Sequence, residues 1–91
     1  MRIRWHEPKR QQVLAERQID FARLDELFEF PYIEDQSNDD PEQYRVIGFA
    51  SGRLVSFIIE YREDGLGDFI WVVTAWHATL QEQRAYEREV Y

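Results

Sequence analysis

The chain has 91 residues, with 11 lysines and arginines against 18 aspartates and glutamates, so its formal net charge is −7. This length corresponds to a single domain spanning residues 1–91. A hydrophobic content of 44% with 15% aromatic residues is too apolar for an intrinsically disordered chain. The absence of cysteine excludes disulfides and thiolate metal sites. The acidic balance also argues against a basic nucleic-acid-binding surface as the default.

The sequence predicts neither a signal peptide nor a membrane-spanning segment. The opening MRIRWHEPKR lacks the apolar core of a signal peptide, and no apolar run approaches the ~18 residues of a membrane-spanning helix. We therefore expect a cytoplasmic protein without membrane association.

Five of the seven net negative charges belong to residues 31–43, PYIEDQSNDDPEQ, which hold five acidic groups and no basic one. Two prolines and the Ser-Asn-Asp-Asp run in this segment predict a loop. Carboxylates such as those of Asp35, Asp39 and Asp40 can bind a hard cation, but their order is not that of a calcium loop. We therefore expect a solvated acidic loop and no metal site.

The first thirty residues predict a strand followed by two helices. Residues 2–5 alternate basic and apolar side chains, as a short strand does. Pro8 suits the first turn of a helix that runs to about Arg17. Asp20 is a typical N-cap for a second helix, and Pro31 ends that helix.

The second half predicts three hairpin-linked strands and a final helix. The strands are expected at residues 44–50, 53–61 and 68–75. Ser51-Gly52 predicts a tight turn, and Thr79 with Glu82 has the form of a capping box that begins the last helix. The order β-α-α-β-β-β-α predicts an α+β fold, an antiparallel sheet of about four strands flanked by helices. The middle strand is apolar on both faces, so helices or a partner must cover both.

Trp71 lies in the third of these strands and Trp76 directly follows its predicted end; the strand can extend to include both. Because they are five residues apart, they are expected to face opposite sides of the sheet. Trp71 is then a core residue. Trp76 can stack on an RNA base, anchor a partner protein, or lie at the edge of the core.

The residues also resemble a known family along nearly the whole chain. RIRWHEPKRQQVLAERQIDFARLDELFEF resembles the start of BrnT-type toxins, which have a Trp-acidic-Glu-Pro-Lys-type turn, an Asn-Leu helix and an Asp-Phe-Ala helix. The second half agrees in Ile47-Gly48, in Gly52 to Leu54, and in the segment from Thr74 to Thr79. The last-helix residues that match are Glu82, Arg84 and Tyr86.

The resemblance implies a RelE-like fold and the ribonuclease half of a type II toxin–antitoxin pair. It implies metal-independent endoribonuclease activity that needs no cofactor and leaves a 2′,3′-cyclic phosphate. The implied partner is a BrnA-like antitoxin, which wraps the toxin and carries a ribbon-helix-helix segment. Operator DNA would then be bound by the complex, and by the toxin only indirectly.

Metal-free RNA cleavage needs a base for the 2′-hydroxyl, a cation for the phosphate and an acid for the leaving oxygen. His77 is the best acid–base candidate from its residue type, and the alternative is a polar surface histidine without a catalytic role. The resemblance adds Arg84 as a phosphate ligand and Tyr86 as a group that orients or protonates. Tyr86 can alternatively pack against the sheet.

Two strand arginines and a tryptophan complete the candidate set. Arg45 and Arg53 can bind substrate phosphate, and Trp76 a base, although exposed arginines are also common on strands without any such role. The chain departs from the family elsewhere: Glu16-Arg17-Gln18 replaces Lys-His-Gly, and family basic positions hold the residues Gln43, Trp71, Trp76, Leu80, Gln81 and Gln83. These departures leave open an alternative, a catalytically weakened member whose remaining role is to bind protein.

Overall fold

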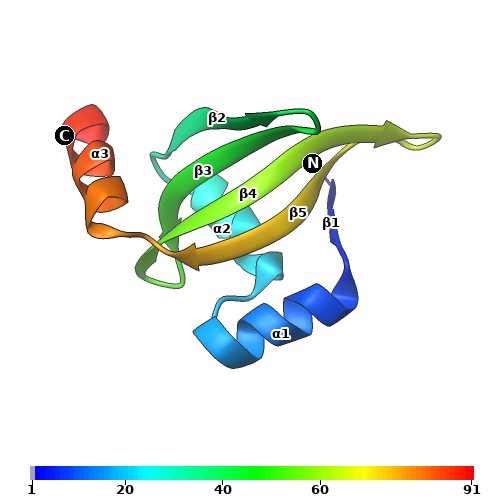
Figure 1. The fold of residues 1–91 in the computed structure, drawn as a ribbon, viewed down its shortest axis with the longest axis horizontal. Coiled ribbons are helices and arrows are strands. Elements are labelled where there is room, and N and C mark those ends of the chain that lie inside the picture. Colours follow the sequence, from blue (N-terminus) through cyan, green and yellow to red (C-terminus); the bar gives the residue numbers. More distant parts are fainter. Residues whose placement is uncertain (1) are drawn as a thin grey trace.

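The computed structural model describes residues 2–91 as an α+β fold built on one five-stranded sheet (Figure 1). The strands are β1 (Arg2–Trp5), β2 (Ile33–Asp39), β3 (Glu42–Ala50), β4 (Arg53–Asp64) and β5 (Gly67–His77). The helices are α1 (Glu7–Arg17), the 3-10 turn η1 (Phe21–Arg23), α2 (Leu24–Glu29) and α3 (Leu80–Val90). No helix in residues 2–91 is long and apolar enough to cross a membrane.

The sheet has the strand order β1-β5-β4-β3-β2. β1 pairs with β5 in parallel, and all other neighbours are antiparallel. Every predicted helix and strand is present in the predicted order, so the fold class is confirmed. The arrangement is consistent with the RelE-like topology that the resemblance implies.

The prediction of a loop over residues 31–43 is wrong, because this segment contains β2 and the start of β3. Ile33 pairs with Ile47 and Asp35 with Arg45, which adds a fifth strand to the sheet. β2 lies at the sheet edge, and every residue in it except Ile33 is exposed. An exposed edge strand needs no apolar alternation, so its polar composition concealed it.

Local signals explain where the elements begin and end. Asp20 accepts a hydrogen bond from the backbone of Ala22 at 2.9 Å and caps η1, as predicted. Ser51 and Gly52 have φ of 53° and 75°, which gives the tight turn between β3 and β4. Gln18 ends α1 with φ of 57°, at the position where the resemblance implies glycine.

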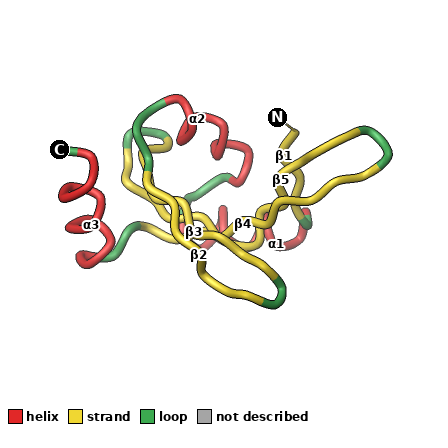
Figure 2. The backbone as a smooth tube through the Cα atoms, turned by 90° about the horizontal axis from the view of Figure 1, so that it is seen from above, coloured by secondary structure: helices red, strands yellow, loops and turns green. Residues whose placement is uncertain are grey.

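The main core lies between one face of the sheet and the helices α1, η1 and α2. Phe21, Leu24 and Leu27 are fully buried against Phe57 and Ile59 of β4. In both views α3 stands apart from this layer (Figures 1 and 2).

The opposite face of the sheet carries a second, smaller cluster. Ile47 of β3 and Tyr86 of α3 are buried together with Ala78. The two sheet faces are therefore covered by different helices, and α3 packs on a smaller set of residues.

A register shift in β5 overturns the prediction for the two tryptophans. Ile58 pairs with Thr74 and Ile59 with Val72, so β5 has one extra residue at this point. Trp71 is paired with Glu60 and Trp76 with Ser56, which places both tryptophans on the same face. Trp71 is half-buried beneath the Arg62 guanidinium, 4.6 Å from the ring centre, and is not part of either core cluster.

Gly48 allows α2 to approach β3 closely. A Cβ at this position would lie 2.8 Å from Leu27 Cγ and 3.1 Å from Tyr32 Cβ. We predict that Gly48→Ala lowers the free energy of unfolding by about 1–3 kcal/mol, measured by urea denaturation, because a packed core resists added volume. Gly65→Ala is the control, since nothing lies within 4 Å of its Cβ position. Equal stability of the two variants would contradict the close-approach explanation.

Candidate functional site

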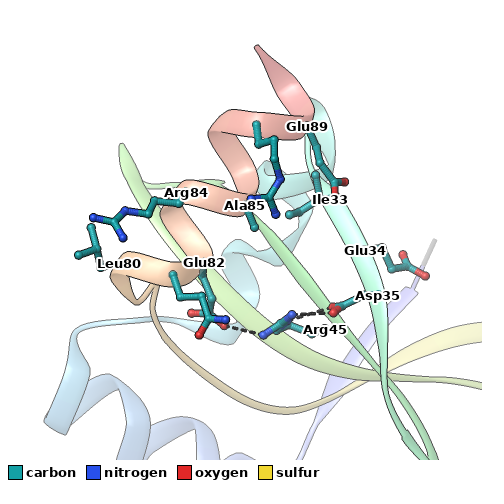
Figure 3. Close-up of a pocket in the computed structure, with 11 residues that line it drawn as sticks. Ile33, Glu34, Asp35, Arg45, Leu80, Glu82, Arg84, Ala85 and Glu89 are labelled. Atoms are coloured by element: carbon teal, nitrogen blue, oxygen red, sulfur yellow. Dashed lines mark hydrogen bonds and ion pairs between the residues drawn. The ribbon is translucent and has the colours of Figure 1, made fainter.

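The candidate residues line separate hollows. The first, here called the α3 groove, has a volume of about 690 Å³ and lies between α3 and the strands β2 and β3 (Figure 3). It contains Arg45 and Arg84. Ile33, Leu80 and Ala85 supply its apolar lining.

Arg45 is held by two carboxylates in the α3 groove. Asp35 accepts from its Nε and Nη2 at 3.0 and 2.6 Å, and Glu82 accepts from Nη1 at 3.2 Å (Figure 3). The hydrogen bond to Asp35 is the main cause that raises the pKa of Arg45, and burial opposes it. A phosphate would have to displace these carboxylates before it could bind Arg45.

Glu82 joins α3 to the sheet. It is only 5% exposed and accepts hydrogen bonds from the Thr79 backbone and the Trp76 indole, each at 2.9 Å. Burial alone would raise the pKa of Glu82, but these hydrogen bonds and the Arg45 charge together lower it.

Arg84 and Arg88 also line the α3 groove. Both are exposed, and neither forms an ion pair or a side-chain hydrogen bond within residues 2–91. They are four residues apart on α3, so they lie on the same side of the helix. They are therefore cations that the fold leaves available.

His77 lies in a second hollow of about 360 Å³, here called the His77 pocket. Its Nε2 is 2.7 Å from the backbone oxygen of Arg17 at the end of α1. A carbonyl oxygen can only accept, so Nε2 carries a proton and Nδ1 of the neutral ring is an acceptor. Arg17 in turn donates from Nη1 to the Ala75 oxygen at 2.7 Å, which fixes α1 against β5.

Arg53 and Arg23 line the His77 pocket as well. Arg53 is exposed and makes no ion pair within the described residues, whereas Arg23 lies 3.6 Å from Glu26. Asp20, also in the pocket lining, is held by Arg10, and this hydrogen bond lowers the pKa of the Asp20 carboxyl. The pocket thus combines an imidazole with an available guanidinium.

Tyr86 faces neither hollow. It is 3% exposed, its hydroxyl donates to the Pro31 oxygen at 2.8 Å, and its ring packs edge-to-face with Phe49 at 5.7 Å. Burial raises its pKa. It lines a third hollow of about 580 Å³ on the other side of α3, here called the Tyr86 hollow.

The structure therefore groups the predicted residues in pairs. Arg45 and Arg84 share the α3 groove, and His77 and Arg53 share the His77 pocket, while Tyr86 is separate from both. Trp76 is engaged with Glu82 and points to the α3 side.

The sequence predictions missed two parts of these hollows. The sequence predicts a loop at Asp35, and a loop prediction gives no pairing between Asp35 and Arg45. Arg88 carries a signal that could have found it, namely its spacing of four residues from Arg84.

A comparison with models of protein families finds no match to this chain, and a search of curated proteins finds none either.

The environment of Glu82 gives a test that depends on pH. We predict that Glu82→Gln lowers the free energy of unfolding at pH 7 by about 1–2 kcal/mol, because a buried charged hydrogen-bond acceptor is lost. The native pKa of Glu82 lies below its ordinary value of 4.5. The stabilisation is therefore complete above that value and is lost as the pH falls through the lowered native pKa.

Urea denaturation between pH 7 and pH 3 measures this difference. Glu87→Gln is the control, because Glu87 is exposed on the same helix. A Glu82→Gln effect that does not change with pH would show that the carboxylate charge is not the cause.

Proposed function

We propose that this chain is the toxin of a type II toxin–antitoxin pair, a metal-independent endoribonuclease of the RelE-like class. The α+β fold in the expected order, together with the resemblance to BrnT-type toxins along the chain, supports this proposal. The proposal places the protein in the bacterial cytoplasm, neutralised by a BrnA-like ribbon-helix-helix antitoxin that alone contacts operator DNA.

The His77 pocket supports the chemistry better than the α3 groove does. The contact with the Arg17 oxygen leaves Nδ1 of neutral His77 as the free nitrogen. We propose that Nδ1 acts as the base and accepts the proton of the RNA 2′-hydroxyl, because a base needs an open lone pair and a fixed orientation.

Arg53 would stabilise the negative charge on the non-bridging oxygens of the pentacoordinate phosphate. The 2′-oxygen attacks the adjacent phosphate, the bond to the 5′-oxygen breaks, and that oxygen takes a proton from solvent or from the imidazolium. The products are a 2′,3′-cyclic phosphate and a 5′-hydroxyl, so no water is consumed. Arg53 is suited to this role because no carboxylate in the described residues occupies its guanidinium.

Expression of the chain alone in bacteria tests the proposal. We expect growth arrest with loss of cellular RNA, relieved when the product of a neighbouring reading frame of ribbon-helix-helix type is co-expressed. Normal growth at high levels of folded protein would contradict the enzyme proposal.

His77→Ala gives the corresponding test of the site. We predict a fall in RNA cleavage of at least about 100-fold, the usual contribution of an acid–base group. His6→Ala is the matched control, because His6 is the other histidine and lies before α1, outside the His77 pocket. If both variants cleave RNA like the parent, His77 is not the base.

Arg53→Ala tests the cation. Its loss should lower cleavage by about 10–100-fold, because one charged donor to the developing oxyanion is removed. Arg62→Ala is the control, since Arg62 lies on the same strand and stacks on Trp71. Thermal melting of each variant separates lost activity from lost folding.

The second candidate function is protein binding without catalysis. Two observations favour it: Arg45 is already bound by Asp35 and Glu82, and Arg84 and Tyr86 are not grouped with His77. The expression experiment distinguishes the two functions, because a binding protein would not degrade RNA.

A further inference from the structure

Another hollow, of about 370 Å³, lies beside α2 on the face of the sheet that α1, η1 and α2 cover. It is here called the aromatic pocket, and its lining residues are Ile3, Asp25, Phe28, Tyr32, Tyr61 and Ile70. It shares none of them with the α3 groove, the His77 pocket or the Tyr86 hollow. Aromatic rings dominate this lining, and no basic residue within residues 2–91 contributes to it.

Contacts outside the aromatic pocket hold its rings in place. The ring centres of Phe28 and Tyr32 are 5.0 Å apart and their planes meet at 77°, so the two rings form a corner. The Tyr61 hydroxyl donates to Glu34 at 2.8 Å, and the Tyr61 ring packs 5.3 Å from that of Tyr44. Tyr32 and Tyr61 are nevertheless 41% and 48% exposed, so much of each side chain is accessible to a ligand.

The aromatic pocket is negative in charge as well as aromatic. Asp25 precedes Phe28 by three residues on α2, so both lie on the same side of the helix. Its carboxylate accepts only from the backbone of Glu26, at 2.8 Å, and has no ion-pair partner within residues 2–91. Glu34 keeps its charge beside the pocket, because the tyrosine hydroxyl that it binds is neutral. The faces of aromatic rings are also negative, so rings and carboxylates attract the same kind of group, a cation.

We propose that the aromatic pocket binds the guanidinium group of an arginine side chain from a partner protein. The planar group lies against the rings of Tyr32 and Tyr61 and pairs with the carboxylate of Asp25. This inference goes beyond the proposed function, since it requires neither RNA cleavage nor an antitoxin.

The fold binds its own arginines in the same way. Four guanidinium groups lie between 4.6 and 5.7 Å from the centre of an aromatic ring, and each of these arginines also pairs with a carboxylate. They are Arg2 and Arg4 over Phe69, Arg10 over Trp5, and Arg62 over Trp71. The aromatic pocket offers rings and a carboxylate without an arginine among its described lining residues, so it provides this combination to an arginine from outside.

The charges of the aromatic pocket favour an arginine side chain over RNA or a free amino acid. RNA bases can stack on tyrosine, but each nucleotide would bring a phosphate toward Asp25 and Glu34. A free amino acid would likewise bring its own carboxylate, and the described lining has no basic residue to pair with it. A guanidinium can stack on a ring and donate two hydrogen bonds to one carboxylate, which an ammonium group cannot. The net charge of −7 also favours a basic partner.

A titration followed by nuclear magnetic resonance tests the proposal on the purified chain. The probe is N-acetyl-arginine amide, and its matched control is N-acetyl-citrulline amide, which has nearly the same shape but no charge. We expect the arginine probe to shift the backbone signals of Asp25, Phe28, Tyr32 and Tyr61. We expect the citrulline probe to bind at least tenfold more weakly, because it lacks the cation for both the rings and the carboxylate. Equal binding of the two probes, or no binding of the arginine probe, overturns the proposal.

Two variants locate the binding. Asp25→Asn should weaken the arginine probe about fivefold, because it removes the charge and keeps the shape. Glu29→Gln is its control, since Glu29 is exposed on the same helix and lies outside the aromatic pocket. Tyr32→Leu should weaken the probe about threefold through loss of a ring face, with Tyr91→Leu as its control. Thermal melting shows whether each variant is folded. Unchanged binding by folded Asp25→Asn and Tyr32→Leu contradicts the assignment to this pocket.

Three further ligands separate the other possible occupants. Tighter binding of tetramethylammonium than of the arginine probe would make the pocket a quaternary ammonium site, and tighter binding of free arginine would make it an amino-acid site. Binding of a short single-stranded RNA that depends on Tyr32, without binding of the arginine probe, would make it an RNA site. Each of these results overturns the proposal. The titration involves no RNA cleavage, so growth arrest without arginine binding refutes this inference alone, and arginine binding without growth arrest refutes the enzyme proposal alone.

Discussion

The buried carboxylate of Glu82 is the interaction on which the arrangement of α3 depends. It accepts from the first turn of its own helix, from Trp76 of β5 and from Arg45 of β3. One side chain thus fixes where α3 begins and how it lies against the sheet. The α3 groove exists because this contact holds the start of α3 beside β3, and β2 forms its opposite wall.

The extra residue in β5 decides which side chains reach that helix. Adjacent residues of a strand point to opposite faces, so Trp76 and His77 separate at the end of β5. Trp76 donates to Glu82 on the α3 side, and His77 meets the end of α1 on the other side. Without the register shift between Ile58 and Ile59, the end of β5 would present the opposite set of side chains to each helix.

The fold was predictable where local chemistry determines it. Helix caps and tight turns form between residues that are close in the chain, and each helix or strand that they begin or end is present. The caps are Asp20 and the pair Thr79 and Glu82, and the turn is Ser51-Gly52. The strand β2 was not predictable, because its stability comes from pairing with β3 and its exposed side chains carry a loop-like composition.

Which candidate residues share a pocket also could not be predicted from the sequence. It depends on the register shift in β5 and on the pairing of Asp35 with Arg45, and both arise from contacts between distant segments. The residue types alone identified His77 and Arg53. That these two residues share a pocket follows from the turn between β3 and β4, which brings Arg53 beside the end of β5.

The positions of the hollows constrain how a partner would inhibit the proposed enzyme. A segment docked in the α3 groove leaves the His77 pocket open, because the two lie on opposite faces of the sheet. The Tyr86 hollow lies on the other side of α3 and shares Ser51 with the His77 pocket. A partner that continues from the groove across α3 would therefore reach His77 through exposed aromatic side chains, with Phe30 at 55% exposure. Inhibition would then require a partner that covers both faces at this end of the sheet, because a segment bound only in the α3 groove would leave His77 accessible to RNA.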